Sequence, residues 1–590
     1  MQNYRPNQEE SKRLMDVALG RAQAELALIN ARLLNVYTGE VLDNSQIAVM
    51  GNWIAYVGRD ASAAIGPQTE VIDVAGQTVI PGLIEGHTHL VWFASISEQL
   101  RHLIPRGTTT VISETLEAFP VAGAQGVIDV LDSFRDQPIK VFGTAPAMVS
   151  ISRAAEGMAP DVLERLMARD DILGMGESYW QALIHRPEFL LPAYQTALRH
   201  HKTLEGHSAG ASEKKLNAYV AAGISSCHEP ITAEEVIDRL RLGMHVMIRE
   251  GSIRRDLETI AKISQSGIHT RGLILSTDGL TPGDLIAKGG LDFVLQKAVD
   301  CGIDPVSAVQ MATLNVAEHF GLDPITGGIA PGRCADMLVI PDLHTIVPQC
   351  VISNGRVVAE KGRLRAAPRR HAYTPESRRT IGLNQKLGAE DLAIPVETNA
   401  EACHVRLIKM VSDLVTKEAI VQMPVSAGHL QIDVNQDILK IAAIDRTIKP
   451  GKRFTGLIRG FGLKRGALAA SNAWDTSDLM VVGADEADMA LAVNRIIELQ
   501  GGAVLCAGGQ VLEEIALPVL GIIADLSLED LAQRLSAITA AAADLGCTFR
   551  DPLLSLVALS GAAIPFLRIC EEGLVDLKTG RTLGLFVDSN

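Results

Sequence analysis

From Leu83 onward, short apolar runs alternate with helix-like stretches for roughly 240 residues, and this repeat constrains the fold more than any other feature. The runs are TTTVIS, IKVFGTA, ILGMG, KTLEGH, ISSCHE, HVMIREG and GLILSTD. Strand-then-helix repetition is typical of parallel βα units. Because a single barrel fits this length, we predict a (β/α)8 TIM-like barrel over residues 85–328, within an α/β chain.

Shorter strands flank the repeat on both sides. Residues 26–58 and 70–82 alternate apolar and polar side chains between Gly and Asn-Asp turns, and residues 325–364 show the same texture after the last helix-like stretch. We therefore expect residues 1–84, which begin with a polar helix, and residues 329–366 to build one small β-sandwich domain together. The basic segment APRRHAYTPESRRT then starts an additional C-terminal α+β domain over residues 367–590.

Composition narrows the class of protein. Hydrophobic residues make up 47% and charged residues 21%, as in a packed globular protein. Lys plus Arg number 54 against 69 Asp plus Glu, a net charge of -15, which argues against a nucleic-acid backbone as the main partner. Eight scattered cysteines without a CxxC pair indicate a reducing compartment. With no signal-peptide-like start and no long apolar run, we expect a cytoplasmic protein that binds neither nucleic acid nor membrane.

The motif VIPGLIEGHTHL places His87 and His89 two positions apart at the end of an apolar strand. Residues at this spacing point to the same face of a strand, so both imidazoles can meet one metal ion. A lone HxH pair is usually incidental. Its position after a buried strand and a Pro-Gly turn makes a ligand pair the better interpretation here.

Four more candidate ligands follow at the ends of later strand-like runs, namely Glu177, His207, His228 and Asp278. Each has an ordinary explanation: a helix N-terminal Glu, a hydrogen-bonded core His, or an Asp-Gly turn. Five strand ends that carry such residues in order are hard to explain as accidents, because a barrel gathers its strand ends at one face. A carboxylate among them, such as Glu177, could bridge two cations.

Three other kinds of site are not predicted from this sequence: a serine-hydrolase site, the zinc site of nucleobase deaminases and a dinucleotide site. GHSAG fits the serine-hydrolase pattern around Ser208, but that motif needs a strained strand-to-helix turn and a later acid-His pair, and barrel periodicity surrounds it. The HxE and PCxxC signature of zinc-dependent nucleobase deaminases is absent. GFGLKRGALAAS does not fit GxGxxG, so no dinucleotide site is predicted.

The chain resembles the adenine deaminase family of the metal-dependent amidohydrolase superfamily over most of its length. The matching segments are LIPRGTTTVIS, GHSAGASEKKLNAYVAAGISSCHE, LRLGMHVMIREGS, DPVSAVQMATLNVAEHFGL, IAPGRCADMLVI, GFGLKRGALAAS and DTSDLMVVGADEADMALAVN. Many amidohydrolases use a carboxylated Lys as the bridging ligand; this chain has Glu177, as adenine deaminases do.

The resemblance implies hydrolytic deamination of adenine to hypoxanthine and ammonia, with two divalent ions per chain, manganese, iron or zinc. His87 and His89 would hold one ion and His207 and His228 the other, with Glu177 spanning both. Glu177 and Asp278 would be the catalytic residues, and Asp278, also a metal ligand, would move protons as general base and then acid. A purine base is the expected small-molecule partner, and a homo-oligomer is the expected assembly.

Several stretches depart from the family pattern. LVWFAS replaces the usual Ile-Glu-Ser-Ser, STDG replaces Thr-Asp-Asp, and WDTSD, residues 474–478, replaces His-Asp-Ser-His-Asn. SETLEAF replaces a stretch with Asp-Pro-His-Glu, which makes Glu114 and Glu117 candidates for substrate binding. These departures keep two alternatives open: hydrolysis of another aminated heterocycle or cyclic amide on the same site, and a non-catalytic paralogue. We expect the C-terminal domain to pack on the barrel mouth and help close the pocket.

Overall fold

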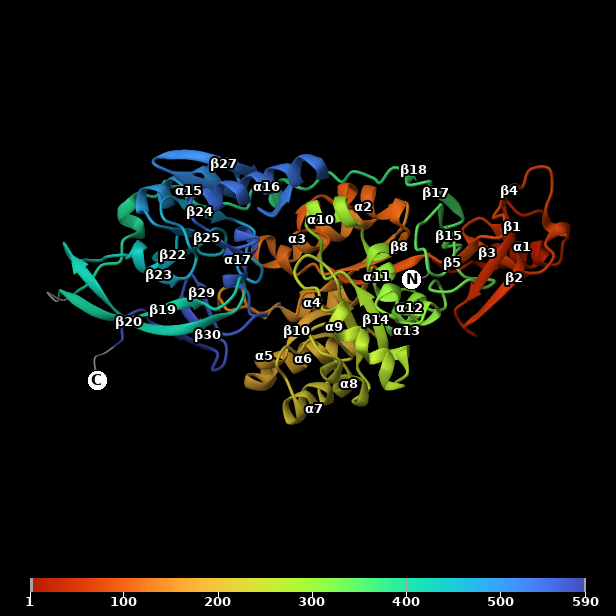
Figure 1. Cartoon of the computed structure of the whole chain (residues 1–590), viewed down its shortest axis with the longest axis horizontal. Helices are drawn as coiled ribbons and strands as arrows, with labels where there is room; N and C mark the ends of the chain where they lie inside the picture. Colours follow the sequence, from red (N-terminus) through yellow and green to blue (C-terminus); the bar gives the residue numbers. More distant parts are fainter. Residues whose placement is uncertain (1–3, 148, 398–400, 588–590) are drawn as a thin grey trace.

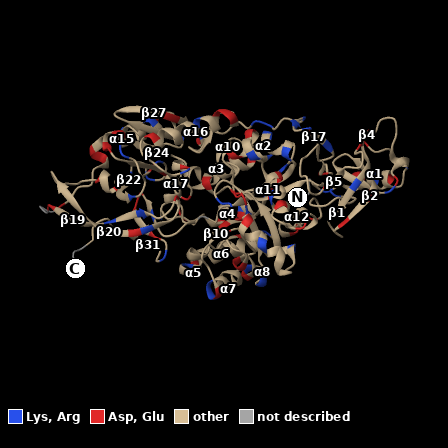
Figure 2. Cartoon of the chain, in the orientation of Figure 1, with Lys and Arg blue, Asp and Glu red and all other residues tan. Residues whose placement is uncertain are grey.

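The computed structural model describes residues 4–147, 149–397 and 401–587. The chain is elongated, with the barrel in the middle, the strands of its N-terminal part at one end and the C-terminal domain at the other (Figure 1). No helix among the described residues is long and apolar enough to cross a membrane. Acidic and basic residues are interspersed over all three parts in the view of Figure 2.

Eight parallel strands within the described residues form the central barrel. They are β6 (Leu83–Thr88), β8 (Thr108–Ser113), β9 (Lys140–Ala145), β10 (Ile172–Tyr179), β11 (Thr203–His207), β12 (Ser226–Cys227), β13 (His245–Arg249) and β14 (Leu273–Ser276). The first five and the last three pair continuously. The Ser225 N–H donates to the Leu204 carbonyl, and the Asp278 N–H to the His87 carbonyl, at the two junctions. The predicted barrel is therefore confirmed.

Helices alternate with the strands as the apolar pattern predicts. They are α2 (Ile96–Leu103), α3 (Phe119–Phe134), α4 (Pro160–Met167), α5 (Trp180–His185), α6 (Pro187–Arg199), α7 (Glu213–Ala221), α8 (Ala233–Arg241), α9 (Leu257–Ile260), α10 (Pro282–Lys288), α11 (Leu291–Asp300), α12 (Pro305–Met311) and α13 (Leu314–His319). Successive strand residues divide between two apolar clusters. One contains Ile84, Ile112, Phe142, Leu173, Met247 and Ile274. Their strand neighbours Leu83, Val111, Val141, Ile172, Val246 and Leu273 belong to the other. This alternation is expected when one face of each strand points into the barrel and the other toward the helices.

The N-terminal and post-barrel strands join in a single nine-stranded sheet beside α1 (Gln8–Ala18). Its members are β1 (Leu26–Asn35), β2 (Glu40–Met50), β3 (Trp53–Gly58), β4 (Glu70–Asp73), β5 (Thr78–Pro81), β15 (Met337–Ile340), β16 (Cys350–Ser353), β17 (Arg356–Glu360) and β18 (Arg363–Leu364). β5 pairs antiparallel with β15, with Val79 opposite Val339. The predicted recruitment of post-barrel strands is confirmed. The expected boundaries after residues 84, 328 and 366 stay a prediction.

The C-terminal part is an α+β domain, as predicted. Its nine-stranded sheet comprises β19 (Ala402–Met410), β20 (Thr416–Ser426), β21 (His429–Leu430), β22 (Ile438–Asp445), β23 (Arg453–Arg459), β24 (Ala467–Ala470), β25 (Asp478–Gly483), β26 (Gly502–Ala507) and β27 (Gln510–Ala516). A three-stranded sheet of β29 (Leu567–Cys570), β30 (Gly573–Asp576) and β31 (Arg581–Leu583) adds to it. The domain also contains the helices α14 (Pro375–Arg378), α15 (Glu486–Leu499), α16 (Leu528–Asp544) and α17 (Pro552–Val557).

The stretch LVWFAS, one of the departures from the family pattern, joins this domain to the barrel. Within it, β7 (Phe93–Ala94) pairs in parallel with β28 (Ile523–Ala524) of the C-terminal domain. Both strands are buried. The C-terminal domain thus lies directly against the chain that leaves the first barrel strand, at the same end of the barrel as the predicted ligands.

Candidate metal centre and active site

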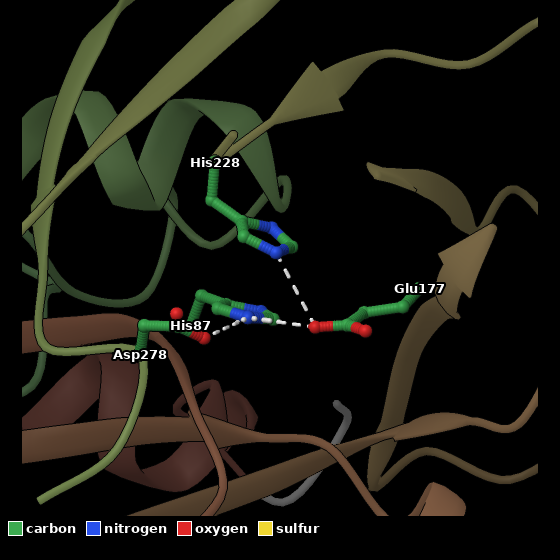
Figure 3. Close-up of side chains that lie close together, drawn as sticks. All are labelled: His87, Glu177, His228 and Asp278. Carbon is green, nitrogen blue, oxygen red and sulfur yellow. Dashed lines mark hydrogen bonds and ion pairs between the residues drawn. The ribbon is translucent and has the colours of Figure 1, made fainter. Parts of the chain in front are cut away.

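Four of the predicted ligands meet in one buried cluster at the carboxyl ends of the barrel strands (Figure 3). Glu177 Oε1, from β10, lies 3.4 Å from His87 Nε2 and 3.3 Å from His228 Nε2. Asp278, just after β14, places Oδ1 3.2 Å from His87 Nε2. These ligand atoms all lie within 4.8 Å of one another, so one or two ions could be bound between them.

The other two predicted histidines lie beside this cluster. His89 Nε2 is 3.4 Å from Glu177 Oε1 and 3.7 Å from Asp278 Oδ1. His207, the last residue of β11, packs its ring edge-on against the ring of His228, with centroids 5.1 Å apart. The structure therefore brings all six predicted residues to one place.

Glu229 was missed by the sequence reasoning, although it directly follows His228. Its Oε1 is 3.2 Å from His207 Nε2 and 3.5 Å from His228 Nε2, and these three residues form a second group with metal-ligand spacing. The signal was available, because an acid that follows a predicted ligand at a strand end lies at the same barrel face. The adjacent letters H and E in GISSCHEP could have carried that inference.

Arg249, the last residue of β13, is the second residue that the sequence reasoning missed. Its side chain is 4% exposed and pairs with Glu229, with Asp278 Oδ2 at 3.1 Å and with Asp256 at 3.3 Å. A guanidinium with several fixed donors can hold carboxylates in defined positions. Arg249 therefore fixes the side of the Asp278 carboxylate that faces away from the histidines.

Glu114 and Glu117 lie behind the histidines. Glu117 Oε1 is 2.6 Å from His89 Nδ1, and Glu114 Oε1 is 3.7 Å from His87 Nδ1. Glu117 also lines the cavity described below, whereas Glu114 accepts a hydrogen bond from the Thr144 hydroxyl at 2.8 Å. A carboxylate on the far nitrogen of a metal-binding imidazole fixes the orientation of that ring.

The electrostatics of the cluster favour a bound cation. Burial alone would lower the pKa of His87, but hydrogen bonds with Asp278 and Glu177 outweigh burial and raise that pKa to about 10. Burial also opposes ionisation of the two acids. The facing imidazoles hold the pKa of Glu177 well below its usual range, and His87 with Arg249 lowers the pKa of Asp278. Ionised carboxylates thus surround imidazoles that would otherwise bind protons, and a divalent cation can replace those protons.

A cavity of about 480 Å³ opens over the cluster, between the barrel mouth and the C-terminal domain. Glu177, His207, His228 and Asp278 form part of its floor. Residues 412–415, 474–475 and 563–565 of the C-terminal domain form part of its wall. The expected closure of the pocket by this domain is confirmed, and a concave site between domains is typical of small-molecule binding.

Tyr179 and Asp475 meet in this cavity from the two sides of the domain boundary. The Tyr179 hydroxyl, on β10, lies 3.3 Å from Glu177 Oε2 and 3.3 Å from each carboxylate oxygen of Asp475. Burial raises the pKa of Asp475 to about 7. Asp475 belongs to the altered stretch WDTSD, but nothing in the sequence pattern showed which barrel residue it would face.

Comparison with known proteins identifies the family. The adenine deaminase C-terminal domain family matches residues 413–581, and the amidohydrolase family matches residues 78–358. An adenine deaminase of Clostridium botulinum (strain Langeland) is 34% identical over 595 residues, which cover 99% of each chain. The chain belongs to the adenine deaminase family. Other adenine deaminases at 36% identity come from Moorella thermoacetica, covering 97% of both chains, and from Rhizobium meliloti, covering 97% of this chain and 98% of its own.

Membership of the adenine deaminase family makes the chain a metal-dependent hydrolase. Among solved structures it is similar to the beta-aspartyl dipeptidase of Fervidobacterium islandicum AW-1, at 15% identity and a TM-score of 0.47. That match covers 58% of this chain and 97% of the dipeptidase.

Proposed function

We propose that this protein hydrolyses adenine to hypoxanthine and ammonia. The observation that carries the proposal is the convergence of His87, Glu177, His228 and Asp278 on one point beneath an interdomain cavity, in a chain related over its full length to adenine deaminases. An aromatic base fits the cavity because apolar side chains line it, namely Trp92, Leu116, Ile253, Leu414, Trp474 and Ile564.

The donor set fits two divalent ions. We propose that His87 and His89 would hold one ion and His207 and His228 the other, and that Glu177 would contribute to both, with Asp278 as a further ligand. Glu229 is a candidate ligand on the His207 side, because of its distances to that imidazole and to His228. Imidazole nitrogens and carboxylate oxygens suit manganese, iron and zinc alike. Such ions lower the pKa of water and so supply a nucleophile at neutral pH.

Asp278 is the proposed proton carrier. Its carboxylate takes one proton from the attacking water as the water oxygen bonds to the ring carbon and the C=N electron pair moves to the ring nitrogen. Asp278 passes that proton to the amino group; the electron pair then re-forms the C=N bond, the C–N bond to the amino group breaks, ammonia leaves, and the C–O bond remains. Arg249 keeps Asp278 in place and keeps it ionised, because the guanidinium is 3.1 Å from Oδ2 and both groups are buried. General-base catalysis requires this fixed position within reach of the water.

Two glutamates support the ring orientations. We propose that Glu117 orients His89 and, because it lines the cavity, that it contacts the substrate. Glu114 lies on the far side of His87, and we propose that it orients that ring instead of binding substrate directly. Two ions per chain, a purine base as substrate, a homo-oligomer and a cytoplasmic location complete the proposal.

Ammonia release from a panel of adenine, other aminopurines, pterins and cyclic amides tests the assignment, with the metal-loaded protein as the enzyme. We expect adenine to be turned over with equal amounts of hypoxanthine and ammonia. Turnover of another compound on the panel with no activity on adenine would contradict the substrate. No turnover of any compound, with the metal bound, would indicate a non-catalytic paralogue.

A further inference from the structure

Asp475 forms a fixed part of the cavity wall although it belongs to the C-terminal domain. It lies in the segment between β24 and β25 and is 4% exposed. The hydroxyl of Ser150, from the chain that follows β9, donates a 2.5 Å hydrogen bond to the backbone carbonyl of Asp475. This contact crosses the domain boundary and links the backbone of Asp475 to the barrel.

Hydrogen-bond acceptors outnumber donors around this carboxylate. The Ala562 N–H donates to Oδ2 at 2.6 Å. The Tyr179 hydroxyl has one proton, yet it lies 3.3 Å from both oxygens of Asp475 and 3.3 Å from Glu177 Oε2. In its ionised form Asp475 offers about four lone-pair sites, so one shared proton and one N–H leave acceptor capacity unused in that form.

Both oxygens of Asp475 already have the Tyr179 hydroxyl or the Ala562 N–H as a donor, and the remaining lone pairs can accept a hydrogen bond from a ligand that supplies a further donor. The apolar side chains of the cavity wall, among them Trp474 beside Asp475, favour a flat heterocycle. An unsubstituted purine base carries an N–H on its five-membered ring. A base that is alkylated or glycosylated at that nitrogen lacks this N–H and needs more space.

We propose that Asp475 accepts a hydrogen bond from the ring N–H of the bound base and so selects the unsubstituted base over its ring-substituted derivatives. The inference rests on the proposed function, since it concerns the substrate of the same site. It gives the C-terminal domain a part in substrate recognition. The barrel supplies the reacting groups, and Asp475 binds the ring N–H of the substrate.

The test compares metal-loaded parent, Asp475→Ala and Asp475→Asn for kcat/KM on adenine, 7-methyladenine and 9-methyladenine. We expect the parent to prefer adenine over at least one methylated base by about 100-fold or more, because sites built for an N–H reject analogues without it. In Asp475→Ala, kcat/KM should fall at least tenfold on adenine and less than threefold on that methylated base. The ratio of the two kcat/KM values should therefore be smaller than in the parent. Asp475→Asn keeps the volume and an acceptor for the Ala562 N–H, and should lie between the two.

Asp544→Asn is the matched control, because Asp544 is an exposed acid at the end of α16 in the same domain. It should retain the parent preference. Circular dichroism and metal content check that each variant is folded and loaded. The proposal is overturned if Asp475→Ala keeps the parent preference, or if the parent does not discriminate against either methylated base. If the parent does not deaminate adenine, the proposed function fails separately, and calorimetric binding of purine and its 7- and 9-methyl derivatives makes the same comparison without turnover.

Discussion

Asp278 is the residue on which the proposed chemistry most depends. It faces the imidazole of His87 on one side and Arg249 on the other, and it is buried at the carboxyl end of the last barrel strand. Its backbone has a φ of 58°, a left-handed conformation that Asp tolerates better than most residues. This turn directs the carboxylate back over the strand ends.

Asp278→Asn should abolish turnover while metal content stays near that of the parent. The amide keeps the size and one oxygen but cannot take up a proton, and general-base catalysis commonly contributes about 10²–10⁴-fold. Steady-state kcat and elemental analysis of the purified variant check both parts. Activity above a tenth of the parent value would show that another group moves the proton.

Arg249→Gln should lower both activity and stability, because it leaves Glu229, Asp256 and Asp278 without their shared cation. Breaking a buried ion pair typically costs about 3–5 kcal/mol. We expect a lower melting temperature and a drop in kcat of at least tenfold, with Arg249→Lys between parent and Gln. Arg241→Gln is the control, since that side chain is 73% exposed. A variant with the parent melting temperature and kcat would rule out the positioning role.

At the scale of elements, the sequence was sufficient to predict which residues lie at the ends of the barrel strands. His87, Glu177, His207, His228 and Asp278 all follow recognisable apolar runs, so the barrel repeat was sufficient to bring them together. Arg249 and Glu229 also lie at strand ends, so the same repeat places them at the barrel mouth. Contacts that depend on the packing of separate elements could not be predicted from any periodic pattern.

The buried pair of Lys140 and Asp336 ties the barrel to the flanking β-sheet. Lys140 begins β9, and its ammonium lies 2.8 Å from Asp336, just before β15, and 2.8 Å from Asn354 Oδ1. Lys140→Met leaves the Asp336 carboxylate buried without its cation, at an expected cost of about 3–5 kcal/mol. Thermal unfolding should show a clear drop in melting temperature, whereas Lys12→Met, at an exposed position, should not. An unchanged melting temperature for Lys140→Met would contradict this role.

His245, the first residue of β13, provides a pH dependence that is separate from the active site. Burial and the neighbouring His319 lower its pKa from 6.5 to about 4. Between these values the unfolded chain binds the proton more readily, so this contribution to stability is present above pH 6.5 and lost as the pH falls toward 4. His245→Asn should therefore show a smaller fall in melting temperature from pH 6.5 to 4.5 than the parent. His269 is exposed, and His269→Gln should show the same change of melting temperature with pH as the parent. If the melting temperatures of the parent and of His245→Asn fell equally between pH 6.5 and 4.5, the prediction would be wrong.

At the scale of the whole molecule, the barrel and the C-terminal domain supply different parts of the site. The barrel gathers the ligands. The C-terminal domain joins the barrel through β28 and lines the cavity with Asp475 and residues 412–415 and 563–565. Tyr179 and Asp475 are 296 positions apart in the sequence, and their contact depends on how two domains pack. That the domain covers the barrel mouth could be expected because ligand sites commonly lie between domains, but no sequence pattern predicts which of its side chains enter the site.

Anomalous X-ray diffraction from crystals of the metal-loaded protein, recorded at the absorption edge of the bound metal, tests the central claim most directly. We predict two peaks per chain, one in contact with His87 and His89 and one with His207 and His228, with Glu177 between them. Metal peaks at other residues, or a loaded protein without metal at these histidines, would contradict the account.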